Sequence, residues 1–214
     1  MKKFELTAES KINIFGKKLF RIKALISFGD VKEGETGGWV EKEENLEQSS
    51  GNAEVYGNAW VYGDAEVYGN AEVYGNARVY GDARVSGNAR VSGNAEVYGN
   101  ARVYGDARVS GNAEVYGNAR VYGDARVSGD AMVSGNAEVY GNADYTTIRG
   151  FGTQFRATTF FRCKDKQIRV SCGCFFGTIS EFREQVKNTR KGKIAEEYLM
   201  IADLMEKHFA EEAK

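Results

Sequence analysis

The 214-residue sequence contains no proline, one histidine and three cysteines. The absence of proline excludes a proline-rich disordered chain and a collagen. Histidine is the side chain that titrates near neutral pH, so a single copy leaves little material for general acid–base or metal chemistry. An odd number of cysteines fits a reducing compartment rather than a framework of disulfides.

A large charge of one sign and a long apolar run are missing as well. The formal net charge is −1, which argues against a general nucleic-acid binder because such proteins are usually strongly basic. No apolar run approaches the roughly 18 to 20 residues that cross a bilayer, and no apolar signal-peptide core follows the first five residues. We therefore expect a cytoplasmic protein without a membrane or nucleic-acid partner.

Glycine, in contrast, is abundant, with 26 copies. Residues 51–146 consist of sixteen uninterrupted hexads (96/6), such as GNAEVY, GNARVY and GDARVS. Ala and Val lie two positions apart and share one face of a strand, while the residue between them and the Tyr or Ser after Val point outward. Gly with Asn or Asp supplies a turn. Because one such strand buries only two small side chains, it is stable only where successive turns stack.

This pattern, with an aliphatic residue followed four positions later by a small one in every hexad, resembles the hexapeptide-repeat family of left-handed parallel β-helices. The resemblance implies an all-β solenoid of triangular cross-section with 18 residues per turn, or about 5.3 turns (96/18). The flanks are similar to those of phage, prophage and bacterial members of unassigned function that are often labelled transferases. The segments that carry this second likeness are 20–25, 28–46, 159–161, 172–178 and 196–199.

The sequence divides into three parts. Residues 1–50 predict a β-hairpin over 11–26 and degenerate first turns at Trp39-Val40 and Asn45-Leu46, and residues 51–146 form the repeat β-helix. Residues 147–214 predict a second hairpin, with strands at 158–163 and 167–174, and two helices. The first helix begins after Thr178, whose capping box uses Glu181, and the second begins near Lys193. Since open ends of a β-helix would template fibre growth, we interpret both flanks as caps.

Sorting the hexads by threes predicts which outward side chains stack on each face. One face carries three arginines, each accompanied by a serine, in a flat cationic strip. Like charges about 5 Å apart cost energy unless something opposes them, and guanidinium groups bind carboxylate or phosphate with two hydrogen bonds. We predict that this strip binds an acidic protein surface or an anionic ligand; the alternative is that the guanidinium groups simply stack in solvent. The strip comprises Arg90, Ser92, Arg108, Ser110, Arg126 and Ser128.

Another face carries a row of aromatic side chains. Flat aromatic stripes favour protein interfaces, and they also stack on sugars or bases. Self-association into a dimer or trimer is the plainer interpretation of this row. It comprises Trp60, Tyr62, Tyr80, Tyr98 and Tyr116.

The sequence offers few residues for catalysis or for metal binding. Acyltransferases of the resembled family usually take a proton from the substrate with a histidine on the prism, but His208, the only histidine, lies outside residues 51–146. Cys163, Cys172 and Cys174 could supply three thiolates to zinc, yet a fourth ligand is missing. We expect no catalytic residue, no cofactor and no metal.

Three functions stay open. The favoured one is a non-enzymatic scaffold of phage or prophage type, which binds a partner such as a host protein in the bacterial cytoplasm. The second is a protein that sequesters an anionic, nucleotide-like small molecule. The third is a hexapeptide acyltransferase that uses a tyrosine or carboxylate in place of histidine.

Overall fold

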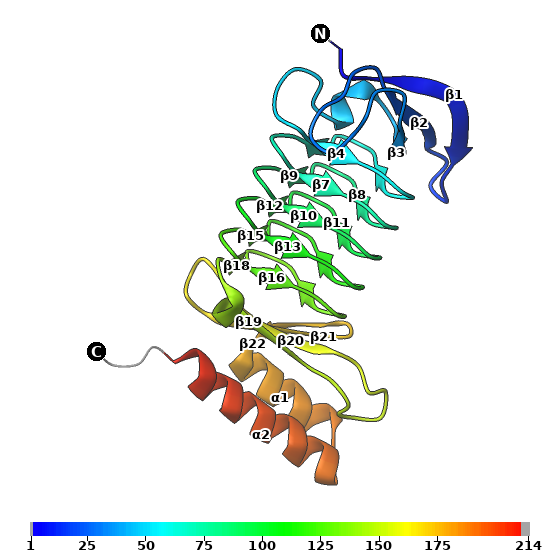
Figure 1. The fold of residues 1–214 in the computed structure, drawn as a ribbon. Helices are drawn as coiled ribbons and strands as arrows, with labels where there is room; N and C mark the ends of the chain where they lie inside the picture. Colours follow the sequence, from blue (N-terminus) through cyan, green and yellow to red (C-terminus); the bar gives the residue numbers. More distant parts are fainter. Residues whose placement is uncertain (1, 211–214) are drawn as a thin grey trace.

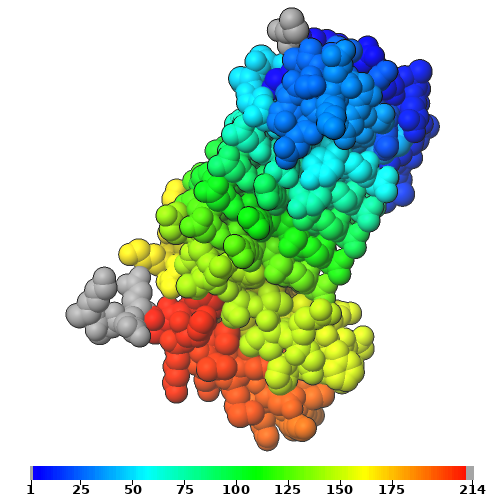
Figure 2. All heavy atoms as spheres, viewed as in Figure 1, coloured from blue at the N-terminus to red at the C-terminus, as the bar shows by residue number. Residues whose placement is uncertain are grey.

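A computed structural model describes residues 2–210 as a rod with a different module at each end. An N-terminal cap, blue in Figures 1 and 2, is followed by a stack of short strands and then by a module of four strands and two helices. None of the helices in residues 2–210 is long and apolar enough to span a bilayer.

The central stack is built from fifteen two-residue strands. They form three parallel sheets, in which each strand pairs with the strands three positions before and after it along the chain. The first sheet has the order β16-β13-β10-β7-β4, the second continues from β5 through β8, β11 and β14 to β17, and the third has the order β18-β15-β12-β9-β6. The strands are β4 (Glu54–Val55), β5 (Trp60–Val61), β6 (Glu66–Val67), β7 (Glu72–Val73), β8 (Arg78–Val79), β9 (Arg84–Val85), β10 (Arg90–Val91), β11 (Glu96–Val97), β12 (Arg102–Val103), β13 (Arg108–Val109), β14 (Glu114–Val115), β15 (Arg120–Val121), β16 (Arg126–Val127), β17 (Met132–Val133) and β18 (Glu138–Val139).

The Ala and Val of the fifteen hexads from residue 51 to residue 140 point inward and fill one continuous core. Nearly all of them are completely buried, as the periodicity predicts. Backbone hydrogen bonds join each turn to the next; in the first sheet, for example, the amides of Arg90 and Ser92 donate to the carbonyls of Ala107 and Val109, both at 2.9 Å. The predicted solenoid with three hexads per turn is therefore confirmed.

The degenerate first turn that the sequence predicts is also confirmed. Strand β3 (Thr36–Val40) continues the second sheet, where Trp39 pairs in parallel with Trp60, and Leu46 bridges to Val67 of the third sheet. The two members of each pair are 21 residues apart in the sequence (60−39 and 67−46), whereas they are 18 apart in the regular turns. This first turn therefore carries three extra residues. Short helix η1 (Glu43–Asn45) turns the intervening corner. With this turn the solenoid has about six turns.

The final hexad, residues 141–146, leaves the solenoid. It forms the short helix η2 (Asn142–Asp144) and the start of strand β19 (Tyr145–Ile148). Asp144 takes the outward position of this hexad, and its carboxylate accepts hydrogen bonds from the amides of Tyr140 and Gly141, both at 3.0 Å. Because the carboxylate closes this turn locally, the backbone no longer adds a parallel strand.

The N-terminal cap is an antiparallel hairpin of β1 (Phe4–Ile12) and β2 (Lys18–Ala24), and β2 pairs with β3. The predicted hairpin is confirmed, and its first strand begins earlier than predicted. Buried Phe4 and partly buried Leu6 pack against the end of the Ala/Val core, and this packing extends β1 back to Phe4, where it still pairs with β2. The second sheet thus runs without interruption from the cap into the solenoid.

The C-terminal module places a four-stranded antiparallel sheet across the other end of the solenoid (Figure 1). Its strands are β19, β20 (Thr158–Arg162), β21 (Ile168–Cys172) and β22 (Phe175–Thr178), so the predicted hairpin is confirmed and two strands are added. Neighbouring residues of β20 serve two cores, because Phe161 closes the solenoid core and Phe160 joins the core beneath the helices.

Two helices cover the outer face of this sheet, α1 (Ile179–Thr189) and α2 (Gly192–Phe209). The predicted capping box is confirmed: the Glu181 amide donates to Thr178 Oγ1 at 3.2 Å, and the Thr178 amide donates to Glu181 Oε2 at 2.7 Å.

Candidate functional site on the solenoid faces

The predicted arginine strip is assembled on the first sheet. Arg90, Arg108 and Arg126 lie in register on β10, β13 and β16, and their side chains are exposed. Ser92, Ser110 and Ser128 follow them along the adjoining corner. In the two turns before the strip this corner carries Tyr56 and Tyr74, whose rings stack at 4.9 Å. The switch from tyrosine to serine leaves the arginines beside short side chains.

The strip is only partly neutralised by its neighbours. Glu72, one turn before Arg90, pairs with it at 2.9 Å. Within residues 2–210, neither Arg108 nor Arg126 has a carboxylate oxygen within salt-bridge distance. Two adjacent guanidinium groups therefore face solvent without a counter-charge, in an arrangement that an added carboxylate would stabilise.

A second row of arginines, on the third sheet, provides a comparison. Arg84 and Arg120 pair with Glu66 and Glu138 at 3.5 and 3.7 Å, at the two ends of the row. Only the central Arg102 has no such partner in the described part of the chain, and Tyr104 follows it at the corner. The first sheet is thus the face with the larger uncompensated positive charge.

The tyrosine ladder is formed as predicted in the sequence. The rings of Tyr62, Tyr80, Tyr98 and Tyr116 stack nearly parallel, with centroids 4.9 to 5.0 Å apart. The hydroxyls of Tyr80 and Tyr98 donate to Glu96 and Glu114, both at 2.9 Å. Burial and these carboxylates raise the pKa of both phenols well above the usual value, so both remain hydrogen-bond donors.

The N-terminal end of this ladder already has a partner within the chain. Tyr62 is 6% exposed and packs in one cluster with Leu19 of the hairpin and Trp39. The Lys11 ammonium lies over the rings of Trp39 and Trp60, at 3.9 and 4.2 Å from their centroids. Self-association through the ladder stays a prediction, and it is restricted to the part beyond the hairpin, from Tyr80 to Tyr116.

Rows of asparagine along the corners are a feature that our sequence analysis did not single out. At one corner, the side-chain amides of Asn76, Asn94 and Asn112 donate in turn to the next residue of the row at 3.1, 3.1 and 2.8 Å, and the row ends on Asp130. The signal was present in the sequence, because every hexad has Asn or Asp at its second position. Aspartate suits the end of such a row since it only accepts hydrogen bonds.

The cysteines and the single histidine do not converge. Cys163 forms a backbone β-bridge with Ala137 at the end of the solenoid, whereas Cys172 ends β21 and Cys174 lies in the β21–β22 turn. Burial raises the pKa of the Cys163 thiol to about 11, which keeps it protonated. His208 is exposed on α2. Within residues 2–210 there is no cluster of three or more potential metal ligands.

The fold and the stacked outward rows define a β-solenoid repeat protein. The comparison with protein families agrees: a model described as YdcK beta solenoid repeat matches seven overlapping segments, 71–87, 83–99, 95–111, 101–115, 107–123, 113–128 and 125–141. Together they span residues 71–141, about a third of the chain (71/214). The matched segments lie within the regular turns and include Arg90, Arg108 and Arg126. No curated protein matches the chain.

Proposed function

We propose that this chain is a non-enzymatic scaffold of phage or prophage type that binds an acidic protein surface through the arginine strip in the bacterial cytoplasm. The observation that carries the proposal is the pair Arg108 and Arg126, exposed in register and without a carboxylate partner in the described chain. A partner that supplies carboxylates there forms charge-assisted hydrogen bonds and relieves the repulsion between neighbouring guanidinium groups.

The shape of the strip favours a protein partner over a small molecule. Its residues stand on short strands of a parallel sheet and along one straight corner, so they form a flat row of stacked side chains. Small ligands are usually bound in concave pockets, whereas protein partners bind to flat surfaces. The absence of histidine from the repeats supports a binding role over acyl transfer.

Charge reversal on one face, with the same change on another face as control, tests the proposal. The probe is a fluorescein-labelled peptide of ten glutamates, whose binding is followed by anisotropy. We expect Arg108→Glu to weaken binding about tenfold or more, because it removes one guanidinium and adds a repulsive carboxylate. We expect Arg102→Glu, on the third sheet, to bind as the wild type does.

Salt provides an independent check, since screening weakens exposed charge pairs. Binding that falls as the salt concentration rises, together with a specific loss in Arg108→Glu, supports the proposal. Equal weakening by both variants would indicate a general charge effect and would contradict it, as would a wild-type protein that does not bind the peptide.

A further inference from the structure

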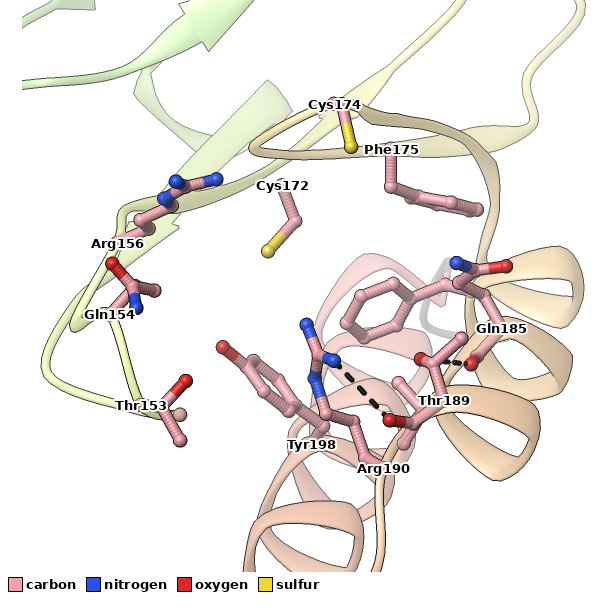
Figure 3. A pocket seen from close by; sticks show the side chains of 13 residues that line it. Thr153, Gln154, Arg156, Cys172, Cys174, Phe175, Gln185, Thr189, Arg190 and Tyr198 are labelled. Atoms are coloured by element: carbon pink, nitrogen blue, oxygen red, sulfur yellow. Dashed lines mark hydrogen bonds between the residues drawn. The ribbon is translucent and has the colours of Figure 1, made fainter.

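A hollow of about 120 Å³ lies in the C-terminal module, apart from the arginine strip (Figure 3). Three segments that are distant in the sequence enclose it: the loop between β19 and β20, the β21–β22 turn, and the adjoining ends of α1 and α2.

Two glycines with positive φ lie against side chains that line the hollow. Gly152 has φ +70°, and a β-carbon there would lie 2.5 Å from the Tyr198 hydroxyl, which donates to the Phe151 carbonyl at 3.3 Å. At the opposite turn, Gly173 has φ +61°, and a β-carbon there would lie 2.8 Å from Nη1 of Arg156. The Tyr198 hydroxyl and the Arg156 guanidinium therefore lie close to the backbone at positions that have no side chain, and both residues line the hollow.

The inner surface of the hollow is apolar. Phe182 and Val186 of α1 are both 3% exposed, and the Phe182 ring makes an edge contact with Tyr198 at 5.8 Å and a tilted contact with Phe175 at 5.5 Å. An engineered apolar cavity of about 150 Å³ is large enough for benzene, so this hollow has room for about one aromatic ring or a branched aliphatic group.

Its rim carries positive charge. Arg190 and Arg156 both line the hollow, and Figure 3 shows the Arg190 side chain beside Tyr198 and Arg156 across from it next to Gln154. Arg190 donates to the Thr189 carbonyl at 3.3 Å, which holds its guanidinium over the end of α1. None of the lining residues is acidic, so no lining carboxylate neutralises the two arginines.

We infer that this hollow is a binding site for a small organic carboxylate with an aromatic or branched aliphatic body. The body fills the space against Phe182 and Val186, and the carboxylate remains at the rim. There it accepts hydrogen bonds from Arg190 and Arg156, and Gln185 and Thr153 offer further polar groups. Since the site shares no residue with the arginine strip, either proposal can fail without the other.

Titration of the full-length protein with benzoate tests this inference. Amide resonances in a ¹H–¹⁵N spectrum report where the probe binds, and thermal unfolding reports whether it stabilises the fold. We expect saturable shifts at Gly152, Thr153 and Arg190 and a rise in Tm with benzoate concentration. Benzamide, which has the same shape without the charge, should bind at least tenfold more weakly.

Two variants with the same loss of charge locate the binding. Arg190→Gln should weaken benzoate binding about tenfold, whereas Lys191→Gln, at the neighbouring position that does not line the hollow, should leave it unchanged. Because both positions are exposed, we expect both variants to fold. The inference is overturned if benzoate causes no saturable shift, if benzamide binds equally well, or if inorganic phosphate displaces benzoate at equal concentration, which would define a bare anion site.

Discussion

The corner glycines from Gly51 to Gly117 each lie directly against a glycine of the next turn. Gly93 has φ +69°, and a β-carbon there would lie 3.0 Å from both the amide nitrogen and the carbonyl oxygen of Gly111. Gly129 has almost the same conformation, at φ +70°, but a β-carbon there would meet nothing within 4 Å. The two residues therefore separate the effect of backbone conformation from the effect of close packing between turns.

Alanine substitutions at these two glycines should differ in their effect on stability. Gly129→Ala forces an L-residue into a left-handed conformation and should lower the free energy of unfolding by about 1 kcal/mol. Gly93→Ala adds a clash with backbone atoms that cannot rotate away, and we expect a loss of about 2 to 3 kcal/mol. Urea unfolding followed by circular dichroism measures both, and equal losses would mean that close packing at the corners contributes nothing.

At the scale of elements, the hairpin β1–β2 places an ammonium group over two tryptophan rings. Lys11 projects from β1 onto two indole rings, and Arg21 and Arg78 lie over the same rings at 4.9 and 5.1 Å. Burial, and after it the neighbouring charge of Arg21, lower the pKa of Lys11 from 10.5 to about 8, although the aromatic faces attract its ammonium. The folded protein thus binds this proton less tightly than the unfolded chain does.

The pH dependence of stability follows from that difference. Between about pH 8 and 10.5 the unfolded chain carries more of this proton than the folded protein, so the contribution of Lys11 to the free energy of unfolding rises with pH in this window. Below about pH 8 both states are protonated, and the contribution is constant. Urea unfolding at pH 7, 8, 9 and 10 should show the difference between wild type and Lys11→Met shifting in favour of the wild type above pH 8. A pH-independent difference would contradict this expectation.

The elements differ in how well the sequence predicted them. The hexads specify the solenoid because one rule, Ala and Val inward and Gly at the corner, is repeated in phase, and helix α1 has a local capping signal at Thr178. The contact of Lys11 with Trp39 and Trp60 is not encoded by any local pattern, since it joins residues 28 and 49 positions apart (39−11 and 60−11).

The candidate sites also differ in how far the sequence predicts them. The rows of the arginine strip could be read from the hexads, because stacking is fixed by the 18-residue period. Whether an arginine of the strip is neutralised depends on the carboxylates that stack beside it in the folded chain. Glu72 neutralises Arg90 in this way. The hollow of the C-terminal module brings together side chains from 152 to 198, and such a meeting follows only from tertiary packing.

For the whole molecule, length is set by the number of hexads. Each turn contacts only its neighbours, so the removal of one complete turn should leave the remaining contacts in place. We expect a chain that lacks residues 87–104 to fold with both end modules intact and to be shorter by about 5 Å in small-angle scattering. A chain that lacks residues 87–95 joins the complete hexad 81–86 to the second half of the hexad 93–98, which breaks the register of the turns, and it should lose the β-sheet signal in circular dichroism. If the full-turn deletion also failed to fold, the turns could not be independent units.

Strand β20 has a mechanical consequence for this rod. Domain boundaries usually lie in exposed linkers, about which domains swing, but here Phe160 and Phe161 anchor one strand in two cores at once. The junction therefore lacks a hinge, and bending it would open one of the cores. The C-terminal hollow consequently lies at a fixed angle and distance from the arginine strip. In an assembly that contacted both, this chain would therefore set the distance between the two bound partners.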